Sequence, residues 1–549
     1  MNRRPDIIIF NPDQMRADAL AHLGNPASIT PNLDAFAASE AVSFRNAFCQ
    51  NPVCVPSRCS FATGLYPHVR GHRTMAYLLE EGESSIFSEL KDAGYYVWMN
   101  ARNDLVAGQV KGLCERHASE IFYGGTVPAA PGTVNPNPRG ERGSKNFYSF
   151  YQGEMKRDEN GKNYSSDDEA VDAAAAQLKA APKDEPQCIF LGLMYPHPPY
   201  HVEEPYFSAI DRKKLRARAK NLPDAQKAYI ETLCRKNMIG LEQYTEEDWN
   251  ELRAVYLGMC MKVDEQFGRI IRALKESGRY DNAAIFFFSD HGDYTGDYDL
   301  PEKNQNAFSN DLVNVPLLIK PPKGVPIDPG VSDSLAELVD FYATAMDFAG
   351  VSPGHTHFGH SLRPILADRS AALREYVFCE GGRNAGETHC DEYHNAHKHG
   401  ENVNGEYWPR QKAMSDDAGH CKGTMIFDGR YKLVYRAHGN LEFYDLREDP
   451  LEERNKALDG RYFSEIARLQ TAMLSWYQDT CDIVPFKPDA RFSAEMLWNR
   501  VKGIIPHGRV AEMKAFLEKE TDISLVYQKA YQLKNENDIT SRSLGIRPF

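Results

Sequence analysis

Apolar segments that end abruptly in polar residues are the feature that most constrains the fold of this chain. Residues 6–10 read DIIIF and continue into NPDQ, and residues 283–288 read AAIFFF and continue into SDHGD. A short apolar run without alternation is typical of a strand buried on both faces of a parallel sheet. Ligands of such sheets bind beyond the carboxyl ends of the strands. The polar residues that follow these two runs are therefore candidate site residues.

Further predicted strands alternate with predicted helices. The apolar runs at 95–100, 187–195 and 315–320 predict buried strands, and residues 249–276 have the pattern of one long amphipathic helix that ends near Gly278. Alternation of this kind is typical of helices packed on both faces of a sheet. The sequence therefore predicts an α/β fold with a large, mostly parallel sheet flanked by helices.

The last third of the chain has a different pattern. Residues 423–450 predict a short antiparallel meander with Gly-containing turns, and the part beyond about residue 490 is mainly helical in pattern. A chain of 549 residues is also too long for one ordinary core. We therefore predict a large α/β domain at 1–365 and a smaller α+β subdomain with a short antiparallel sheet and a helical tail at 366–549.

Charge and cysteine content exclude several classes of protein. The net charge of -13 argues against binding to nucleic acid or to an anionic membrane. The chain has 11 scattered cysteines and no Cys-X-X-Cys pair, a pattern that favours reduced thiols over a disulfide framework. No apolar run approaches the roughly 20 residues of a membrane helix, and the N-terminal run is too short for a secretory signal. We expect a cytoplasmic protein with no membrane and no nucleic-acid partner.

The segment NPVCVPSRCSFATG, residues 51–64, surrounds Cys54 with residues that a buried structural thiol does not need. If a helix starts near residue 55 with Pro56 in its first turn, Arg58 projects near Cys54 from the same side. The N–H groups of that helix N-terminus favour an anion. The segment therefore predicts a site for an anionic ligand, with Cys54 facing solvent.

Six further segments join this one in a family resemblance. Cys-X-Pro-Ser-Arg followed by Thr-Gly resembles the signature of type I sulfatases, which belong to the alkaline phosphatase-like superfamily. The resemblance extends over residues 6 to about 455, through the segments NPDQ, NARNDL, YPHPPY, SDHGD, GDYDLPEK and YDLREDPLEERN. It implies an alkaline phosphatase-like fold and a sulfuric ester hydrolase that releases inorganic sulfate from a small aryl, sugar or steroid sulfate.

The resemblance also implies a modified cysteine and a metal. In this family the cysteine is oxidised by a maturase to Cα-formylglycine, whose hydrate attacks sulfur beside one divalent ion. The implied metal ligands are Asp13, Gln14, Cys54, Asp290 and His291. Ca²⁺ is the expected ion; Mg²⁺ and Mn²⁺ are alternatives, because glutamine and histidine stand where many members have aspartate and asparagine.

The remaining implied residues surround the sulfate group. The catalytic residues would be Cys54, Arg58, Arg102, His197 and Lys303, with His197 as the general acid. The substrate-binding residues would be Arg102, Asp104, His197 and Lys303. Arg102 and Asp104 depart from the family pattern, because they take positions that are often lysine and histidine.

Taken singly, each of these residues has an ordinary structural explanation as a strand-end cap, a turn, a loop contact or a solvated charge, and Arg102 and Asp104 would then pair with each other on the surface. A histidine-rich segment offers a further choice between a second metal site and a loop near the substrate mouth. Its spacings fit no standard zinc signature, which favours the loop. Its histidines are His389, His394, His397 and His399.

Three functions remain open at this level. A sulfatase is the leading hypothesis. A phosphonate monoester or phosphodiester hydrolase is the alternative, because Asp13-Gln14 with Asp290-His291 resembles formylglycine-dependent phosphonate monoester hydrolases. A binding protein with unmodified Cys54 would hold a sulfated ligand without turnover. The helical tail offers a surface for contact within a homo-oligomer.

Overall fold

The computed structural model describes residues 3–125, 139–156, 165–223, 226–395, 401–486, 491–520 and 522–543. By their internal contacts they form two units, Met1–Ile483 and Val484–Phe549, and each is described by itself. The expected boundary at residue 365 falls inside the first unit and stays a prediction about subdomains.

An eight-stranded sheet forms the centre of the first unit, in the order β10-β2-β9-β8-β1-β6-β3-β4. Neighbouring strands are parallel except at β9, which is antiparallel to both β2 and β8. The large, mostly parallel sheet predicted from the sequence is confirmed. Its strands are β1 (Asp6–Pro12), β2 (Val42–Phe48), β3 (Tyr96–Asn100), β4 (Glu120–Phe122), β6 (Gln187–Leu193), β8 (Ala283–Phe288), β9 (Leu317–Lys320) and β10 (Gly330–Glu337).

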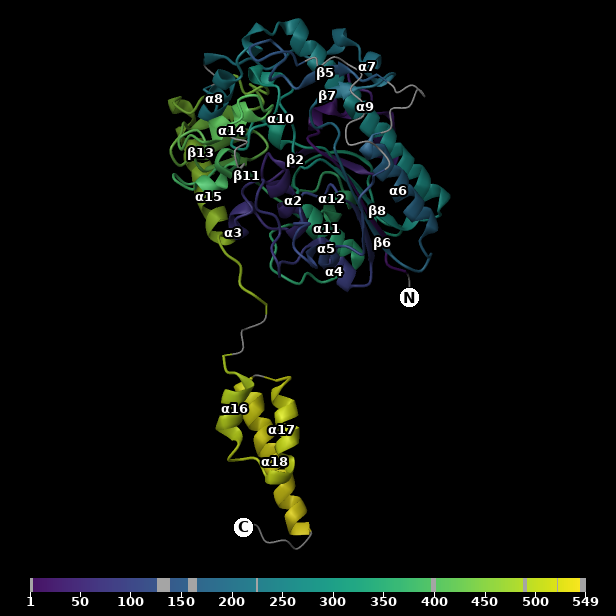
Figure 1. Cartoon of the computed structure of the whole chain (residues 1–549), viewed down its shortest axis with the longest axis vertical. Coiled ribbons are helices and arrows are strands. Elements are labelled where there is room, and N and C mark those ends of the chain that lie inside the picture. Colours follow the sequence, from purple (N-terminus) through teal and green to yellow (C-terminus); the bar gives the residue numbers. More distant parts are fainter. Residues whose placement is uncertain are drawn as a thin grey trace. The chain divides into compact units, whose positions relative to one another are not determined.

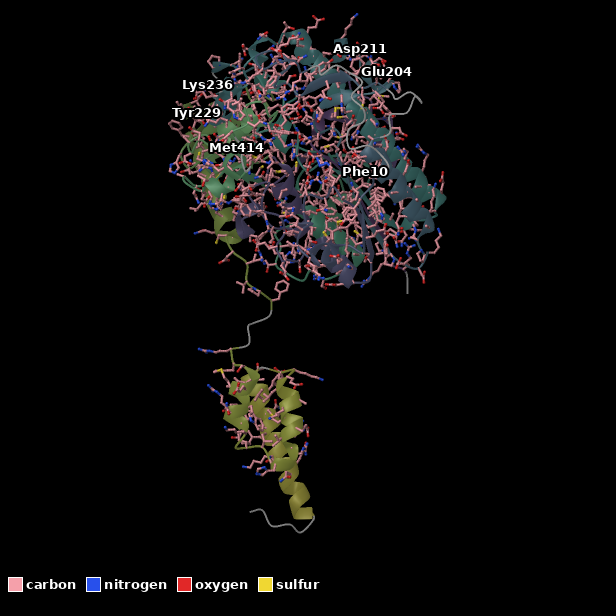
Figure 2. The ribbon with its side chains drawn as sticks, viewed as in Figure 1. Phe10, Glu204, Asp211, Tyr229, Lys236 and Met414 are labelled. Carbon is pink, nitrogen blue, oxygen red and sulfur yellow. The ribbon has the colours of Figure 1, made fainter. Side chains whose placement is uncertain are left out.

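Strand β1 lies between β6 and β8, with Ile8 paired to Ile189 on one side and to Ile285 on the other. All three side chains are buried. Phe10 of β1 lies inside the body of the unit, whereas Asp211 lies at its outer edge (Figure 2). Burial on both faces is the reason that the strand reads as a continuous apolar run.

Helices cover both faces of the sheet (Figure 1). On one face, Phe10 contacts Phe267 of α9 (Glu246–Glu276) with ring centroids 5.5 Å apart. On the other face, Phe288 contacts Phe61 of α2 (Cys54–Thr63) with centroids 5.0 Å apart. The predicted long helix is confirmed as α9, but it begins at Glu246 because a capping box formed with Thr245 starts it earlier. Helices α1 (Pro31–Ser39) and α6 (Ser166–Ala180) pack beside α9 (Glu246–Glu276), and α4 (Ile86–Asp92) and α11 (Val339–Ala349) pack beside α2 (Cys54–Thr63).

A four-stranded antiparallel sheet, β11-β12-β13-β14, forms the later part of the first unit. It contains the predicted meander as β12 (Gly423–Phe427), β13 (Tyr431–Arg436) and β14 (Glu442–Asp445), and adds β11 (Val377–Gly381), which the sequence pattern did not indicate. Helix α15 (Phe463–Thr480) packs on this sheet through Trp476, whose ring stacks on Phe378 with centroids 4.4 Å apart.

Shorter elements complete the first unit. Strands β5 (Tyr151–Glu154) and β7 (Tyr200–Val202) pair with each other in parallel. The short helices are α3 (Pro67–Arg70), α5 (Leu113–His117), α7 (Tyr206–Ala209), α8 (Tyr229–Asn237), α10 (Asn310–Val313), α12 (Arg363–Ala367), α13 (Glu392–Asn395) and α14 (Trp408–Met414).

The second unit is helical, as its sequence pattern predicts. It contains α16 (Ala494–Val501), α17 (Val510–Leu517) and α18 (Ile523–Ser543). Leu497, Met513 and Val526, one from each helix, belong to a small apolar core of its own. Within the described parts of both units, no helix combines the length and the apolar character that crossing a membrane requires.

Candidate active site

Most of the predicted site residues lie where four neighbouring parallel strands end. Strands β8, β1, β6 and β3 are adjacent in the large sheet, so their carboxyl ends meet at one edge. A polar group follows each strand: Asp290 and His291 after β8, Asp13 after β1, His197 after β6, and Arg102 and Asp104 after β3. The topology thus gathers residues that are up to 278 positions apart in the sequence (from 13 to 291).

Helix α2 delivers Cys54 to this edge from the interior. The helix begins at Cys54, follows the extended residue Val53, and is buried along its whole length. Cys54 is 2% exposed, so the expectation that it faces solvent is wrong. The reason is that α2 runs through the core, packed against α11. Burial, and next the charge of Asp13, raise the pKa of the Cys54 thiol well above its usual value.

Four side chains offer metal-ligand atoms within 4.8 Å of one another: Asp13, Cys54, Asp290 and His291. The Cys54 Sγ lies 3.5 Å from Asp13 Oδ1 and 3.3 Å from His291 Nε2. His291 Nδ1 lies 2.8 Å from the Gly292 carbonyl oxygen and donates to it, which leaves the Nε2 lone pair facing the carboxylates. Ligands that each lie about 2.1–2.5 Å from one ion are about 3–4 Å apart. These donors therefore fit a divalent cation.

Gln14 lies at the same place, and its amide faces a lysine. Its backbone N–H donates to Asp290 Oδ1 at 3.1 Å, and its Oε1 accepts a hydrogen bond from Lys303 Nζ at 2.5 Å. The φ angle of Gln14 is 69°, a left-handed conformation that few non-glycine residues adopt. The predicted metal ligand Gln14 thus contacts both a predicted ligand and a predicted sulfate-binding residue.

Two arginines neutralise the buried carboxylates. Arg58 Nη2 donates to Asp13 Oδ2 and Arg58 Nε to Asp290 Oδ2, both at 2.8 Å, and all three side chains are fully buried. Arg102 Nη2 also donates to Asp13 Oδ2, at 2.7 Å. Burial opposes the ionisation of Asp13, but Arg102 and Arg58 outweigh it and hold the pKa of Asp13 well below its usual range.

A glycine near the end of β6 permits this arrangement. A Cβ atom on Gly192 would lie 2.3 Å from the carbonyl oxygen of Arg102 and 3.1 Å from Arg58 Nη1. The carbonyl oxygen of Arg102 accepts from that same Nη1 at 3.3 Å. Any side chain at position 192 would therefore displace the backbone after β3 or the Arg58 guanidinium.

Lys303 and His197 complete the set of predicted catalytic residues, and Lys303 contacts Gln14. Lys303 is buried, and burial favours its neutral amine, yet Cys54, Glu302 and Asp13 raise its pKa above the usual value. His197 Nδ1 lies 2.6 Å from the carbonyl oxygen of Pro198 and donates to it. Burial, and next the charge of Lys303, lower the pKa of His197 well below its usual value.

Arg102 and Asp104 are more than a surface pair. Arg102 Nη1 lies 3.4 Å from Asp104 Oδ2, but the other arm of Arg102 binds the buried Asp13. Asp104 Oδ2 also lies 4.0 Å from Arg58 Nη1, and Asp104 has a positive φ of 48°. The loop after β3 therefore places one cation and one carboxylate beside Cys54.

Two further residues next to the site, Glu302 and Arg410, were not among the predicted site residues, although Glu302 lies in the segment GDYDLPEK. Glu302 lies 3.2 Å from Lys303 Nζ and accepts two hydrogen bonds from Arg410 Nη1, at 2.6 and 2.8 Å. The position of Glu302 next to Lys303 is a signal that could have suggested it. Nothing in the sequence points to Arg410, which lies more than 100 residues further along the chain.

The histidine-rich loop has only two described histidines. His389 and His394 are both exposed, and His394 Nδ1 lies 2.8 Å from Asp391 Oδ2. Neither belongs to a metal-ligating group among the described residues. Tyr77 donates a hydrogen bond to the His389 carbonyl oxygen at 3.2 Å. His397 and His399 lie outside the described residues.

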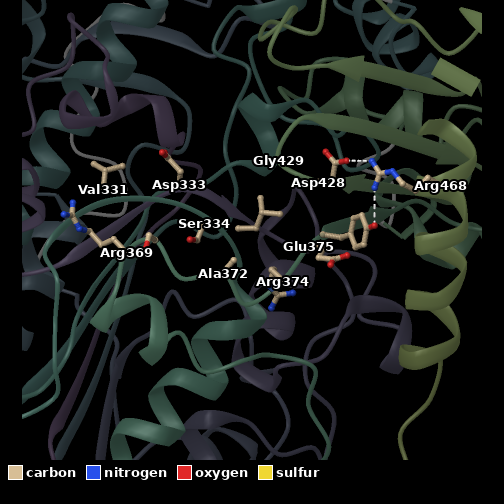
Figure 3. A pocket seen from close by; sticks show the side chains of 13 residues that line it. Val331, Asp333, Ser334, Arg369, Ala372, Arg374, Glu375, Asp428, Gly429 and Arg468 are labelled. Atoms are coloured by element: carbon tan, nitrogen blue, oxygen red, sulfur yellow. Dashed lines mark hydrogen bonds and ion pairs between the residues drawn. The ribbon is translucent and has the colours of Figure 1, made fainter. Parts of the chain in front are cut away.

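A separate open groove of about 820 Å³ holds none of the predicted site residues (Figure 3). Three arginines line it, and each pairs with a carboxylate: Arg369 with Asp328 at 2.9 Å, Arg468 with Glu465 at 2.8 Å, and Arg374 with Glu337 and Asp340. The carboxylates neutralise the arginines, so the groove lacks the positive charge that binding of an anionic substrate would need. The strand-end site remains the candidate active site.

Comparison with known proteins assigns the chain to a family. The sulfatase family profile matches residues 5–351, more than half of the chain. The multifunctional alkaline phosphatase superfamily protein PehA of Trinickia caryophylli is 25% identical over 520 residues, covering 86% of this chain and 95% of that protein. An arylsulfatase of Clostridium perfringens is 24% identical (86% and 94% covered) and a choline-sulfatase of Rhizobium meliloti is 27% identical (83% and 83%).

Solved structures share the fold. A phosphonate monoester hydrolase of Agrobacterium radiobacter superposes with a TM-score of 0.66 at 22% identity, covering 87% of this chain and 96% of that one. A sulfatase-like protein of Bacteroides thetaiotaomicron gives 0.62 at 20% identity, covering 87% and 93%. The predicted alkaline phosphatase-like fold is thereby confirmed. Together with the profile match, this shows that the chain belongs to the sulfatase family of sulfuric ester hydrolases.

Proposed function

We propose that this protein hydrolyses an aryl, sugar or steroid sulfate monoester to the alcohol and inorganic sulfate, with a nucleophile made from Cys54. The observation that carries the proposal is the position of Cys54 at the start of α2, with its Sγ 3.5 Å from Asp13 and 3.3 Å from His291. A maturase would oxidise this side chain to Cα-formylglycine. Once hydrated, that group would supply one hydroxyl that attacks sulfur as the alcohol leaves, and a second that loses its proton and expels sulfate, which re-forms the aldehyde.

A divalent ion fits this proposal. Asp13, Gln14, Asp290 and His291 would hold it together with the side chain at position 54. When bound, such an ion polarises the sulfate oxygens and lowers the pKa of a nearby hydroxyl. The imidazole nitrogen counts against Ca²⁺ and Mg²⁺, which both prefer oxygen ligands, and is best tolerated by Mn²⁺ among the three candidate ions.

The cations of the site have separate roles in this mechanism. Arg58 fixes the carboxylates of Asp13 and Asp290, because it donates a hydrogen bond of 2.8 Å to the Oδ2 atom of each. Arg102 and Lys303 lie where they can hold the sulfate oxygens, which carry the negative charge of the ester. A local positive site of this kind offsets the net charge of -13.

His197 is proposed as the general acid for the leaving alcohol. Without substrate, burial and the Lys303 charge hold its pKa low, so the imidazole is neutral near pH 7. A sulfate anion bound at Lys303 would raise that pKa by screening the lysine and adding negative charge. The Nε2 nitrogen, which is left free by the Nδ1 hydrogen bond to Pro198, would then carry the proton that is donated.

A substrate comparison tests the function. With protein produced alongside a maturase, we expect kcat/KM for 4-nitrophenyl sulfate to exceed that for 4-nitrophenyl phenylphosphonate by at least about tenfold, since the leaving group is the same and the site selects the anionic centre. Steady-state release of 4-nitrophenol measures both. An equal or inverted preference would remove the sulfatase proposal.

The inverted result would support the second candidate, a phosphonate monoester or phosphodiester hydrolase. The specific observation in its favour is the pair of neutral residues, Gln14 and His291, at positions next to Asp13 and Asp290. Their neutrality reduces the negative charge around the reacting centre. Absence of turnover on both esters, with formylglycine present, would favour a binding protein.

Replacement of Lys303 by methionine tests the sulfate-binding side. We expect a loss of about 10²- to 10³-fold in kcat/KM for 4-nitrophenyl sulfate, with KM raised and kcat lowered, because the ammonium group contacts the substrate in both the ground and transition states. Steady-state kinetics provide the measurement, and Lys145→Met, at an exposed lysine paired with Asp248, is the control. If Lys303→Met has the same kcat and KM as the wild-type protein, Lys303 does not bind the ester.

A further inference from the structure

Tyr407 stands next to the catalytic residues without belonging to any of the strand-end loops. It lies immediately before α14 (Trp408–Met414), and its ring centroid is 6.5 Å from that of His197. Behind it, Phe150 lies at 5.1 Å, so the ring is supported on that side by a buried aromatic side chain. Tyr407 itself is only partly buried. A wall of the site is thus built by a segment far from the motifs.

The Tyr407 hydroxyl has no hydrogen-bond partner among the residues that the structure describes. Burial, and next the charge of Glu302, raise its pKa above the usual value, while Lys303 acts in the opposite direction. The phenol is therefore a neutral donor within electrostatic reach of Lys303. In the same wall, the hydroxyl of Tyr148 donates to the Val403 carbonyl oxygen, as a tyrosine with a packing role does.

A buried arginine holds Tyr407 and Lys303 in one arrangement. The Arg410 guanidinium lies 4.9 Å from the centroid of the Tyr407 ring. The same group donates twice to Glu302 and once to Glu392, at 2.6, 2.8 and 2.9 Å. Glu302 in turn lies 3.2 Å from Lys303 Nζ. Contacts through Arg410 and Glu302 thus connect the Tyr407 ring to Lys303.

We propose that Tyr407 contacts the leaving group of the ester and selects esters whose leaving group contains a ring with a polar substituent. The tyrosine ring offers a face on which an aryl or pyranose ring can stack, and the free hydroxyl can donate to the substituent. Arg410 acts as a positioning residue for Tyr407. The inference rests on the proposed function, because it assumes that the reacting sulfate lies between Lys303 and His197.

The experiment compares Tyr407→Phe and Tyr407→Ala in maturase-processed protein on two ring-bearing esters, 4-nitrophenyl sulfate and glucose 6-sulfate, and on acyclic propyl sulfate. We expect Tyr407→Ala to raise KM about tenfold for the ring-bearing esters and less than about twofold for propyl sulfate. Tyr407→Phe keeps the stacking face and should raise KM only about threefold. The ester with the larger loss shows whether the site prefers an aryl or a sugar ring.

The control is Tyr435→Ala, at a tyrosine of β13 that is 49% exposed. It should leave the KM of all three esters unchanged. Thermal unfolding of each variant shows whether it folds. If Tyr407→Ala does not fold, the test depends on Tyr407→Phe, which keeps the packing of the ring. Two results would overturn the proposal. One is a KM for the ring-bearing esters that Tyr407→Ala leaves at the wild-type value. The other is an equal rise in KM for all three esters.

A binding measurement separates this inference from the proposed function. In the Cys54→Ala background, calorimetric titration with 4-nitrophenyl sulfate should show about tenfold weaker binding when Tyr407→Ala is added. If the maturase-processed wild-type protein hydrolyses no sulfate ester but this loss of affinity is found, the proposed function fails and the Tyr407 contact stands. If turnover is found and the affinity does not change, the proposed function stands and the Tyr407 contact is wrong.

Discussion

Replacement of Cys54 by alanine is expected to lower kcat for 4-nitrophenyl sulfate by at least about 10⁴-fold, because no other group in the site can replace a nucleophile that reacts twice. The thiol is buried, but its polar contacts are weak: Sγ lies 3.3 Å from His291 Nε2 and 3.5 Å from Asp13 Oδ1. Removal of this one sulfur atom should therefore lower the free energy of unfolding by only about 1 kcal/mol. Initial rates and urea denaturation measure the two effects.

Cys59→Ala is the matched control for this prediction. Cys59 lies on the same helix α2 and is equally buried, but it contacts none of the site carboxylates through a described hydrogen bond. It should keep full turnover. Mass spectrometry of the peptide with residue 54 should show a mass ~18 Da below cysteine in the active protein. Turnover that survives in Cys54→Ala, or full turnover with an unmodified thiol, would contradict the proposed nucleophile.

Replacement of Arg58 by methionine is expected to destabilise the protein by about 3–5 kcal/mol and to abolish measurable turnover. Asp13 and Asp290 are fully buried, and the arginine is paired with both at 2.8 Å. Its loss leaves the buried Asp290 without this partner and Asp13 with Arg102 as its remaining arginine. Urea denaturation in the presence of a chelator measures the stability. Addition of Mn²⁺ should restore part of it, because a cation between the carboxylates replaces the lost charge.

The acid side of the stability profile should change in the same variant. In the folded protein the pKa of Asp13 lies below its usual value of about 4, so Asp13 contributes stability above the unfolded pKa and loses it as the pH falls toward the folded one. Arg58→Met should reduce that contribution. Arg45→Met, at a half-exposed arginine paired with the exposed Asp333, should cost less than about 1 kcal/mol. Equal losses in both variants would contradict the compensating role of Arg58.

The central strands could be predicted because each is buried on both faces and therefore reads as an uninterrupted apolar run. Strands β2 (Val42–Phe48) and β10 (Gly330–Glu337) were not predicted. They lie toward the edge of the sheet, where exposed positions such as Arg45 and Asp333 interrupt the run. Strand β11 was not predicted either; it pairs with β12 but lies more than 40 residues before it in the sequence, outside the segment that predicts the meander.

The site residues on motifs could be identified for a related reason. Asp13, Asp290 and His291 directly follow strong strand signals, and the carboxyl ends of neighbouring parallel strands meet. Neither the partner of each arginine nor the burial of Cys54 follows from such signals. Both depend on how α2 packs against α11 in the core.

By itself, the sequence determined the class of fold, the family and the residue types available for chemistry at the strand ends, because local patterns encode strands, helix starts and motifs. Only the tertiary structure decided that Tyr407 adjoins His197 and that Arg410 pairs with Glu302. Contacts between segments more than 100 residues apart are set by the packing of whole elements, and no local spacing records them.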